Sequence, residues 1–435
     1  SHPSLAAIHS RNLCVCLDQL GAAMAARVSV LGVGLLCLLA MLSPSAQQSP
    51  PPDSSDLYPS TETPPLPDIR PPPSSPRGYE LDVPPRNVTC KDTDGKRPGC
   101  TGTWPQRCPQ CIVLCPDCKT LCHDEVQMPR PVPPPAMLVF GDGAFDNGNN
   151  GYLEPPNYPY SGTGRLSNRA NLADAIAYTI GFPQSPLPFM SLRGGISMWG
   201  ANYASVGAGI RNSTNGERSI PLSQQLEDFR TTRALMGIML GGETKLRAYL
   251  SKSIFLLGIG GQDLDPIWNI HLANSSEIQS LVALYGEAVT SLYDMGARKV
   301  AIVNVGLIGC APEIFDYRYG CDQSMNDRAA AFNAALKPLM AGLAKKKKGL
   351  FYSIGDFHSF TTTVFADPAA YWMVNIQESC SFKDHPESTC SPLEEYWFWD
   401  SEFMTDQACR LTATAFYYGP PQFTAPMTFK ALLEK

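Results

Sequence analysis

The chain has 435 residues, which exceeds the length of one small domain and is enough to bury a large core. Its formal net charge is −6, so no basic field predicts binding to nucleic acid or to an anionic membrane surface. Fifteen cysteines are unusual in a cytosolic protein and favour an oxidising compartment.

The N-terminal segment predicts secretion. Residues 1–23 precede the first methionine, Met24, contain no recognisable element and are interpreted as a non-native leader. Residues 24–46 combine Arg27, an apolar run over 28–42 and small residues near their end, which is the pattern of a cleaved signal peptide. A membrane anchor is the alternative, but the run is shorter than the ~20 residues that cross a bilayer. We therefore expect a secreted protein with no membrane span in the mature chain.

Secretion makes the Asn-x-Ser/Thr sequons of the chain candidate glycosylation sites. They begin at Asn87, Asn212 and Asn274. Because sequons also arise by chance, each of them is a separate hypothesis.

Residues 47–86 are dense in proline, serine and acidic residues. A segment of this composition cannot bury enough apolar surface to fold, and it favours extended polyproline II. We interpret it as a disordered, solvated linker. Anchoring in an extracellular polysaccharide or protein matrix is the alternative.

Residues 87–128 form a short segment rich in cysteine. Its cysteines are Cys90, Cys100, Cys108, Cys111, Cys115, Cys118 and Cys122. Two Cys-x-x-Cys pairs followed by His123 have zinc-ligand spacing, but zinc ribbons usually place a dozen or more residues between the pairs, and this segment places far fewer. We therefore expect a small disulfide module without metal, of undetermined pairing. Since the segment has seven cysteines, one of them stays free, joins another chain or pairs with a cysteine elsewhere in this chain. The candidate for such a partner is Cys409.

The rest of the chain, residues 136–435, predicts one α/β domain. Apolar runs that predict buried strands cover residues 137–140, 253–257, 299–305 and 349–354. Amphipathic helices are predicted over residues 277–295 and 326–343. Strands that alternate with helices predict a mainly parallel sheet covered on both faces.

The first of these strands ends in a turn of small and polar residues. A sharp turn of this kind aims one side chain out of the sheet edge, and its backbone N–H groups can stabilise a developing oxyanion. The text FGDGAFDNGNN resembles the first motif of the GDSL lipase and esterase family, the SGNH hydrolases, in its plant form F-G-D-S-x-x-D-x-G-N-N. Asp142 and Asp146 match this motif, whereas the nucleophilic serine of the family is Gly143 here.

Two further segments resemble the blocks that supply oxyanion donors in this family. In residues 200–210 the resemblance assigns the oxyanion glycine to Gly207, although Val206 replaces the neighbouring glycine. The family motif G-x-N-D places an oxyanion-donating asparagine at the position of Gln262. Because a donor must lie about 2.7–3.1 Å from the oxyanion, we expect the extra methylene of Gln262 to misplace its amide. In the alternative interpretation, Gln262 bonds a loop backbone.

The last block carries the acid and base of the family, W-D-x-x-H-P-T. Asp400 matches the acid, but the histidine is Phe403, and a phenyl ring can neither accept nor return a proton. The sequence Asp384-His385-Pro386 echoes the lost motif with the wrong spacing, so we interpret it as a surface loop.

The resemblance runs from residue 137 almost to the C-terminus, and it implies a flavodoxin-like three-layer α/β/α fold. The site then lies at the C-terminal ends of the strands. It also implies disulfides Cys310–Cys321 and Cys380–Cys390, which leave Cys409 over in this domain.

Three functions are compatible with these features. The first is a secreted pseudoenzyme, with no intact catalytic residue, that binds an acyl or acetyl ester or a cell-wall polysaccharide. The second is an active ester hydrolase in which another carboxylate or a bound water replaces the serine. The third is a structural extracellular protein, since proline-rich leaders on this fold resemble the anther-specific proline-rich members of the family. No cofactor, metal or nucleic-acid partner is expected, and the sequence predicts no oligomeric state.

Overall fold

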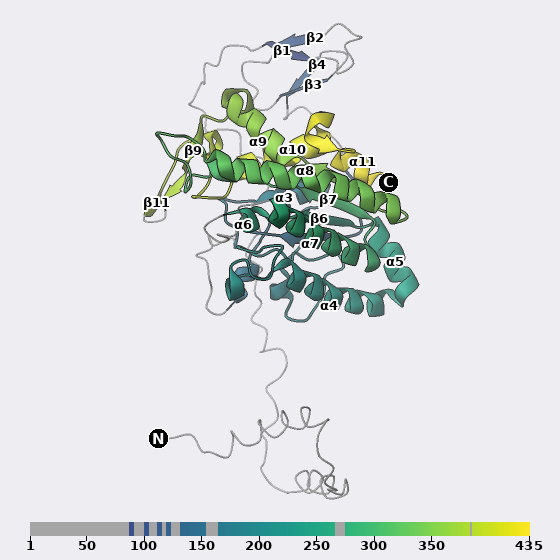
Figure 1. Ribbon diagram of the computed structural model, residues 1–435. Helices are drawn as coiled ribbons and strands as arrows, with labels where there is room; N and C mark the ends of the chain where they lie inside the picture. The colour runs from purple at the N-terminus through teal and green to yellow at the C-terminus, as the bar shows by residue number, and fades with distance from the viewer. Residues whose placement is uncertain are drawn as a thin grey trace, which may run out of the picture. The chain divides into compact units, whose positions relative to one another are not determined.

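The computed structural model describes residues 131–153, 164–265, 275–382 and 385–435, together with the backbone of four short strands that precede them (Figure 1). The predicted leader, signal peptide and proline-rich linker lie outside the described residues. Within the described part, no helix combines the length and apolar character that crossing a membrane requires.

The four short strands belong to the cysteine-rich segment and form two antiparallel pairs. They are β1 (Asn87–Cys90), β2 (Cys100–Thr103), β3 (Cys111–Leu114) and β4 (Lys119–Cys122). The register places Cys90 opposite Cys100 and Cys111 opposite Cys122. Since the remaining cysteines and His123 lie outside the described residues, the disulfide module stays a prediction.

The domain after residue 131 is built on a five-stranded sheet in the order β13-β8-β7-β6-β5. Its strands are β5 (Met137–Gly141), β6 (Ile254–Gly258), β7 (Lys299–Val303), β8 (Phe351–Gly355) and β13 (Thr424–Ala425). The first four pair in parallel and β13 pairs antiparallel with β8. All residues of β5 and β6 are buried, as expected for strands covered on both faces. The predicted mainly parallel sheet is confirmed.

Helices cover both faces of this sheet and give the predicted three layers. One face is covered by α4 (Leu222–Leu240), α5 (Glu243–Lys252), α7 (Ser275–Asp294) and α8 (Gln323–Lys346), which lie together in Figure 1. The other face is covered by α3 (Leu172–Thr179), α9 (Phe357–Ala366), α10 (Asp406–Tyr418) and α11 (Phe429–Leu433). Alternate residues of β5 serve the two cores: Phe140 packs with the first set of helices and Val139 with the second.

Shorter elements complete the domain. The helix α6 (Gly261–Leu264) follows β6, and the small strands are β9 (Asn375–Ser379), β10 (Ser381–Phe382), β11 (His385–Thr389) and β12 (Tyr396–Phe398). The 3-10 helices are η1 (Asn149–Tyr152), η2 (Phe189–Leu192), η3 (Gly216–Arg218), η4 (Ile308–Cys310), η5 (Pro368–Tyr371), η6 (Leu393–Glu395) and η7 (Pro421–Phe423).

Two disulfides of this domain are as the resemblance implied, Cys310–Cys321 and Cys380–Cys390. Of the alternatives left open for Cys409, pairing with the cysteine-rich segment is not seen: it is a free thiol on α10 and is only 2% exposed. Its side chain belongs to the core between α10 and the sheet. Burial also raises the pKa of this thiol well above its usual range, which makes it unreactive.

Candidate functional site

The turn that follows β5 is fixed by hydrogen bonds at the C-terminal edge of the sheet. The Asp142 N–H donates to the carbonyl of Gly258 at 3.1 Å, and the Asp142 carbonyl accepts from Phe145 and Asp146 at 3.1 and 3.0 Å. Gln225 of α4 bonds both backbone groups of Gly141 at 2.9 Å. The turn is therefore held in the position that a nucleophile turn takes in this type of sheet.

Asp146 connects this turn to the segment of residues 200–210. Its Oδ1 accepts from the N–H groups of Gly148 and Asn149 at 2.8 Å, and its Oδ2 accepts from Val206 N–H at 3.1 Å. The carboxyl is fully buried. Asn150 adds a bond from its Nδ2 to the Val206 carbonyl at 2.9 Å. Asp146 thus has a structural role, because its carboxyl binds backbone N–H groups of two separate segments.

The space beside Gly143 is filled by the ring of Phe403. A Cβ placed on Gly143 would lie 2.4 Å from Cζ and 2.7 Å from Cε1 of Phe403, closer than real side chains approach. The ring is 8% exposed and packs with Leu166 and Val206. Gly143 does not have a left-handed backbone conformation, so the Phe403 ring, and not the backbone, is what a side chain at this position would have to displace. The two replacements, at the nucleophile and base positions, fit each other sterically.

Gln262 lies on α6, and its amide is already engaged by other side chains. Its Nε2 donates to Oε1 of Glu402 at 2.6 Å, and its Oε1 accepts from Nδ2 of Asn215 at 3.2 Å. Asn215 also donates to the carbonyl of Gly207, the expected oxyanion glycine, at 2.8 Å. The partners of Gln262 are therefore side chains and not the loop backbone of the alternative interpretation. Glu402 has no counterpart in the motifs that were matched, so sequence reasoning did not find it.

Asp400 shapes the segment that carries Phe403. Its Oδ1 accepts from the N–H groups of Glu402 at 2.9 Å and Phe403 at 2.6 Å. The segment then continues to Thr405, whose hydroxyl accepts from Ala408 N–H at the start of α10. Without a histidine to orient, Asp400 holds the turn that directs Phe403 toward Gly143.

Several carboxyl groups gather at this corner, and their pKa values are raised. Burial raises the pKa of Asp142 to about 7, with the charge of Asp263 adding to the effect. Burial raises the pKa of Asp400 to about 6, against two opposing backbone hydrogen bonds. Burial also raises the pKa of Glu402 well above its usual range, and the nearby charges of Glu313, Asp400 and Asp142 raise it further. A Cβ on Gly261 would lie 3.9 Å from Oδ2 of Asp142, so this carboxyl faces the turn that carries Gln262.

No metal centre or histidine joins this corner in the described part of the chain. No group of three or more potential metal ligands occurs among the residues described. His271 lies outside the described residues, as does Asp384 of the Asp384-His385-Pro386 sequence. His385 begins β11, inside the loop closed by Cys380–Cys390. The sequon at Asn212 is exposed, whereas Asn274 lies outside the described residues.

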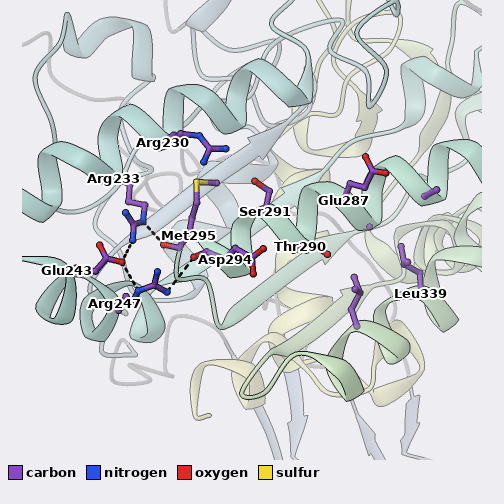
Figure 2. Close-up of a pocket in the computed structure, with 13 residues that line it drawn as sticks. Arg230, Arg233, Glu243, Arg247, Glu287, Thr290, Ser291, Asp294, Met295 and Leu339 are labelled. Carbon is purple, nitrogen blue, oxygen red and sulfur yellow. Dashed lines mark hydrogen bonds and ion pairs between the residues drawn. The ribbon is translucent and has the colours of Figure 1, made fainter.

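A separate groove of about 790 Å³ lies over α7, between α4, α5 and α8 (Figure 2). Figure 2 shows Arg233 and Arg247 converging on Glu243, which pairs with both, and Arg230 pairs with Glu227. Its arginines are thus compensated by acids, and the groove contains none of the predicted site residues. We assign it no ligand.

Comparison with known proteins agrees with this architecture. The sequence model of the family described as GDSL-like Lipase/Acylhydrolase matches residues 137–407. The chain is 30% identical over 336 residues to GDSL esterase/lipase At1g33811 of Arabidopsis thaliana, which covers 68% of this chain and 90% of the relative. It is 30% identical over 340 residues to GDSL esterase/lipase At5g55050 (69% and 90%) and 29% identical over 335 residues to GDSL esterase/lipase LTL1 (68% and 90%), both of Arabidopsis thaliana. The chain therefore belongs to the GDSL lipase/acylhydrolase family.

Proposed function

We propose that this protein is a secreted GDSL-fold pseudoenzyme that binds an acyl or acetyl ester, either free or on a cell-wall polysaccharide, without hydrolysing it. The observation that carries the proposal is the Phe403 ring, which fills the space beside Gly143 where a nucleophile would stand. In a serine protease, loss of the nucleophile or of the base costs about 2 × 10⁶ in kcat. Both are absent here.

The remaining oxyanion donors support the same conclusion. An intact oxyanion hole and substrate binding alone leave roughly 10³–10⁴ over the uncatalysed reaction in serine proteases. Here the Gln262 amide donates one of its two N–H groups to Glu402 and accepts a bond from Asn215, so at most one N–H is left for an ester oxygen. We therefore expect hydrolysis below even that residual level.

The first experiment measures hydrolysis of p-nitrophenyl acetate and a long-chain p-nitrophenyl ester by the purified mature protein. We expect no turnover above an unfolded-protein control. The same protein is then titrated with acetylated xylan and with deacetylated xylan, and we expect binding to the acetylated form only. Equal binding to the two forms, or to neither, would contradict the proposed ester recognition.

A restored variant tests whether only the reacting groups have been lost. Gly143→Ser, Gln262→Asn and Phe403→His together return the family residues, and we expect them to produce ester hydrolysis. The matched control is the same variant with Gly143 retained, which should stay inactive. If the full variant folds but stays inactive, the ester pocket itself has changed.

A second candidate function is ester hydrolysis by carboxyl groups. It is favoured by one observation, the raised pKa values of Asp142 and Glu402 at the same corner. An ionised Asp142 would take the proton of a water that attacks the ester carbon, and a neutral Glu402 would protonate the leaving alcohol. Turnover by the unaltered protein that Asp142→Asn and Glu402→Gln each abolish would establish this function and overturn the pseudoenzyme proposal.

A further inference from the structure

A chain of three amide and carboxyl side chains crosses the mouth of this site. Asn215 precedes η3, Gln262 lies on α6 and Glu402 lies just before α10. Asn215 Nδ2 donates to Gln262 Oε1, and Gln262 Nε2 donates to Glu402 Oε1 at 2.6 Å. We call these three residues the latch. The first bond joins residues 47 apart in the sequence, and the second joins residues 140 apart. The latch is anchored at the Asn215 end by the bond to the Gly207 carbonyl.

The charges of four carboxyl groups from different segments act on the Glu402 end of the latch. Asp142 comes from the turn after β5, Asp265 follows α6, Asp400 precedes Glu402 on the same turn, and Glu313 comes from the loop closed by Cys310–Cys321. Glu313 is held there by two contacts with Ser401: its N–H donates to the Ser401 carbonyl at 3.1 Å, and its Oε2 accepts from the Ser401 hydroxyl at 3.3 Å. An ionised Glu402 would therefore be surrounded by like charges.

We propose that the latch is a pH-sensitive closure of the site. A neutral Glu402 keeps its carbonyl oxygen on Gln262 and helps to hold residues 400–404 over the turn at Gly143. Loss of its proton strengthens the bond from Gln262 but adds repulsion from the surrounding carboxylates. This repulsion outweighs the bond, the latch opens, and the segment that carries Phe403 moves away from Gly143. Gln262 and the nucleophile turn then become accessible.

The direction of the pH dependence follows from linkage. A group whose pKa is raised in the folded state contributes stability that is fully present below its unfolded pKa, about 4.3 for glutamate, and is lost as the pH rises through the folded value. The pKa of Glu402 is raised, and Asp142, at about 7, and Asp400, at about 6, ionise in the same direction and add repulsion. The latch is thus closed in acid and opens as the medium approaches and passes neutrality.

Hydrogen–deuterium exchange of the peptide containing residues 399–406, corrected for the intrinsic pH dependence of exchange, tests this closure between pH 5 and pH 8.5. One released proton changes an opening equilibrium by about tenfold per pH unit. We expect the opening of this segment in the unaltered protein to increase by at least about tenfold over that range. Glu402→Gln keeps the acceptor oxygen and cannot ionise, so it should reduce the pH-dependent change by about tenfold.

Two further variants make the result decisive. Glu394→Gln removes a carboxyl from an exposed residue of η6 and should behave like the unaltered protein. Gln262→Met removes the donor and should leave the segment open even at pH 5. A segment whose opening does not change with pH, or one that responds identically in Glu402→Gln, would overturn the latch. Because no ester takes part, the outcome is independent of the proposed ester binding.

Discussion

Two neighbouring parts of the domain have retained the family residues to very different degrees. The turn around Asp146, Asn149 and Asn150 matches the family motif, whereas Gly143, Gln262 and Phe403 at the corner differ from it. Asp146 and its neighbours satisfy buried backbone groups, so any change there leaves donors without partners. The residues of the corner need only fill space and bond each other. The comparison shows that two different sets of residues are involved. Asp146, Asn149 and Asn150 support the loops by hydrogen bonds, whereas the positions that carry the reacting groups in the family are Gly143, Gln262 and Phe403.

The largest effect is expected at Asp146. Asp146→Ala removes the acceptor of three N–H groups, of which those of Asn149 and Val206 are buried, and each unsatisfied buried group costs about 1–3 kcal/mol, so we expect a loss of about 4 kcal/mol in the free energy of unfolding. Urea unfolding measures this loss. Asp316→Ala is the matched control, because Asp316 also accepts from two N–H groups but is exposed, and water can replace it. Equal losses in the two variants would contradict the distinction between the two parts of the site.

The next effect is expected at Gly143. Gly143→Ser forces a side chain against Phe403 and should destabilise the protein by about 2 kcal/mol, the range for overpacking. In the background of Phe403→Ala the same change should cost much less, which gives a coupling energy of about 1–2 kcal/mol in a double-mutant cycle. Gly342→Ser on α8, where a Cβ meets nothing within 4 Å, is the control. Additive effects of the two changes would show that Phe403 does not fill this space.

A smaller effect is expected from the pH. Since the pKa of Asp142 is raised to about 7, its contribution to stability is complete below about pH 4 and is lost as the pH rises toward and past 7. We expect the free energy of unfolding to fall between pH 5 and pH 8, and Asp142→Asn to reduce that fall by about 1 kcal/mol. Urea unfolding at both pH values is the measurement. If the fall is unchanged in this variant, Asp142 remains ionised throughout.

The smallest effect is expected at the groove over α7. Arg230 pairs with Glu227, and both side chains are more than half exposed. Exposed pairs of this kind contribute about 0–1 kcal/mol, so Arg230→Ala should change the free energy of unfolding by less than about 0.5 kcal/mol. It should leave binding of acetylated xylan unchanged. Weaker binding would place a ligand in this groove.

The arrangement of strands and helices was largely predictable because it depends on local patterns. The apolar runs at 137–140 and 253–257 became buried strands of the sheet, and the matched disulfides are present. The helix predicted over 326–343 is longer than expected, since Asp322 caps its start and it continues through Pro338 to Lys346. Boundaries of this kind depend on caps that periodicity does not show.

Parts of the site were not predictable, because they depend on side chains that meet only in the folded chain. The contact of Gln262 with Glu402 joins residues 140 apart, and the packing of Phe403 on Gly143 spans an even longer separation. The burial of Cys409 was predictable. Cys409 shares a helical face with Thr412, Ala413 and Phe416, and that spacing indicates a buried position.

The fit between Phe403 and Gly143 also has an evolutionary consequence. A chain that regains serine at position 143 first meets the ring of Phe403, so it loses stability before it gains any nucleophilic catalysis. A chain that first replaces Phe403 with histidine opens a cavity beside a glycine and gains no activity. Under the proposed pseudoenzyme function, each single step toward the family residues is disfavoured, so a serine at position 143 would be difficult to regain by one substitution at a time.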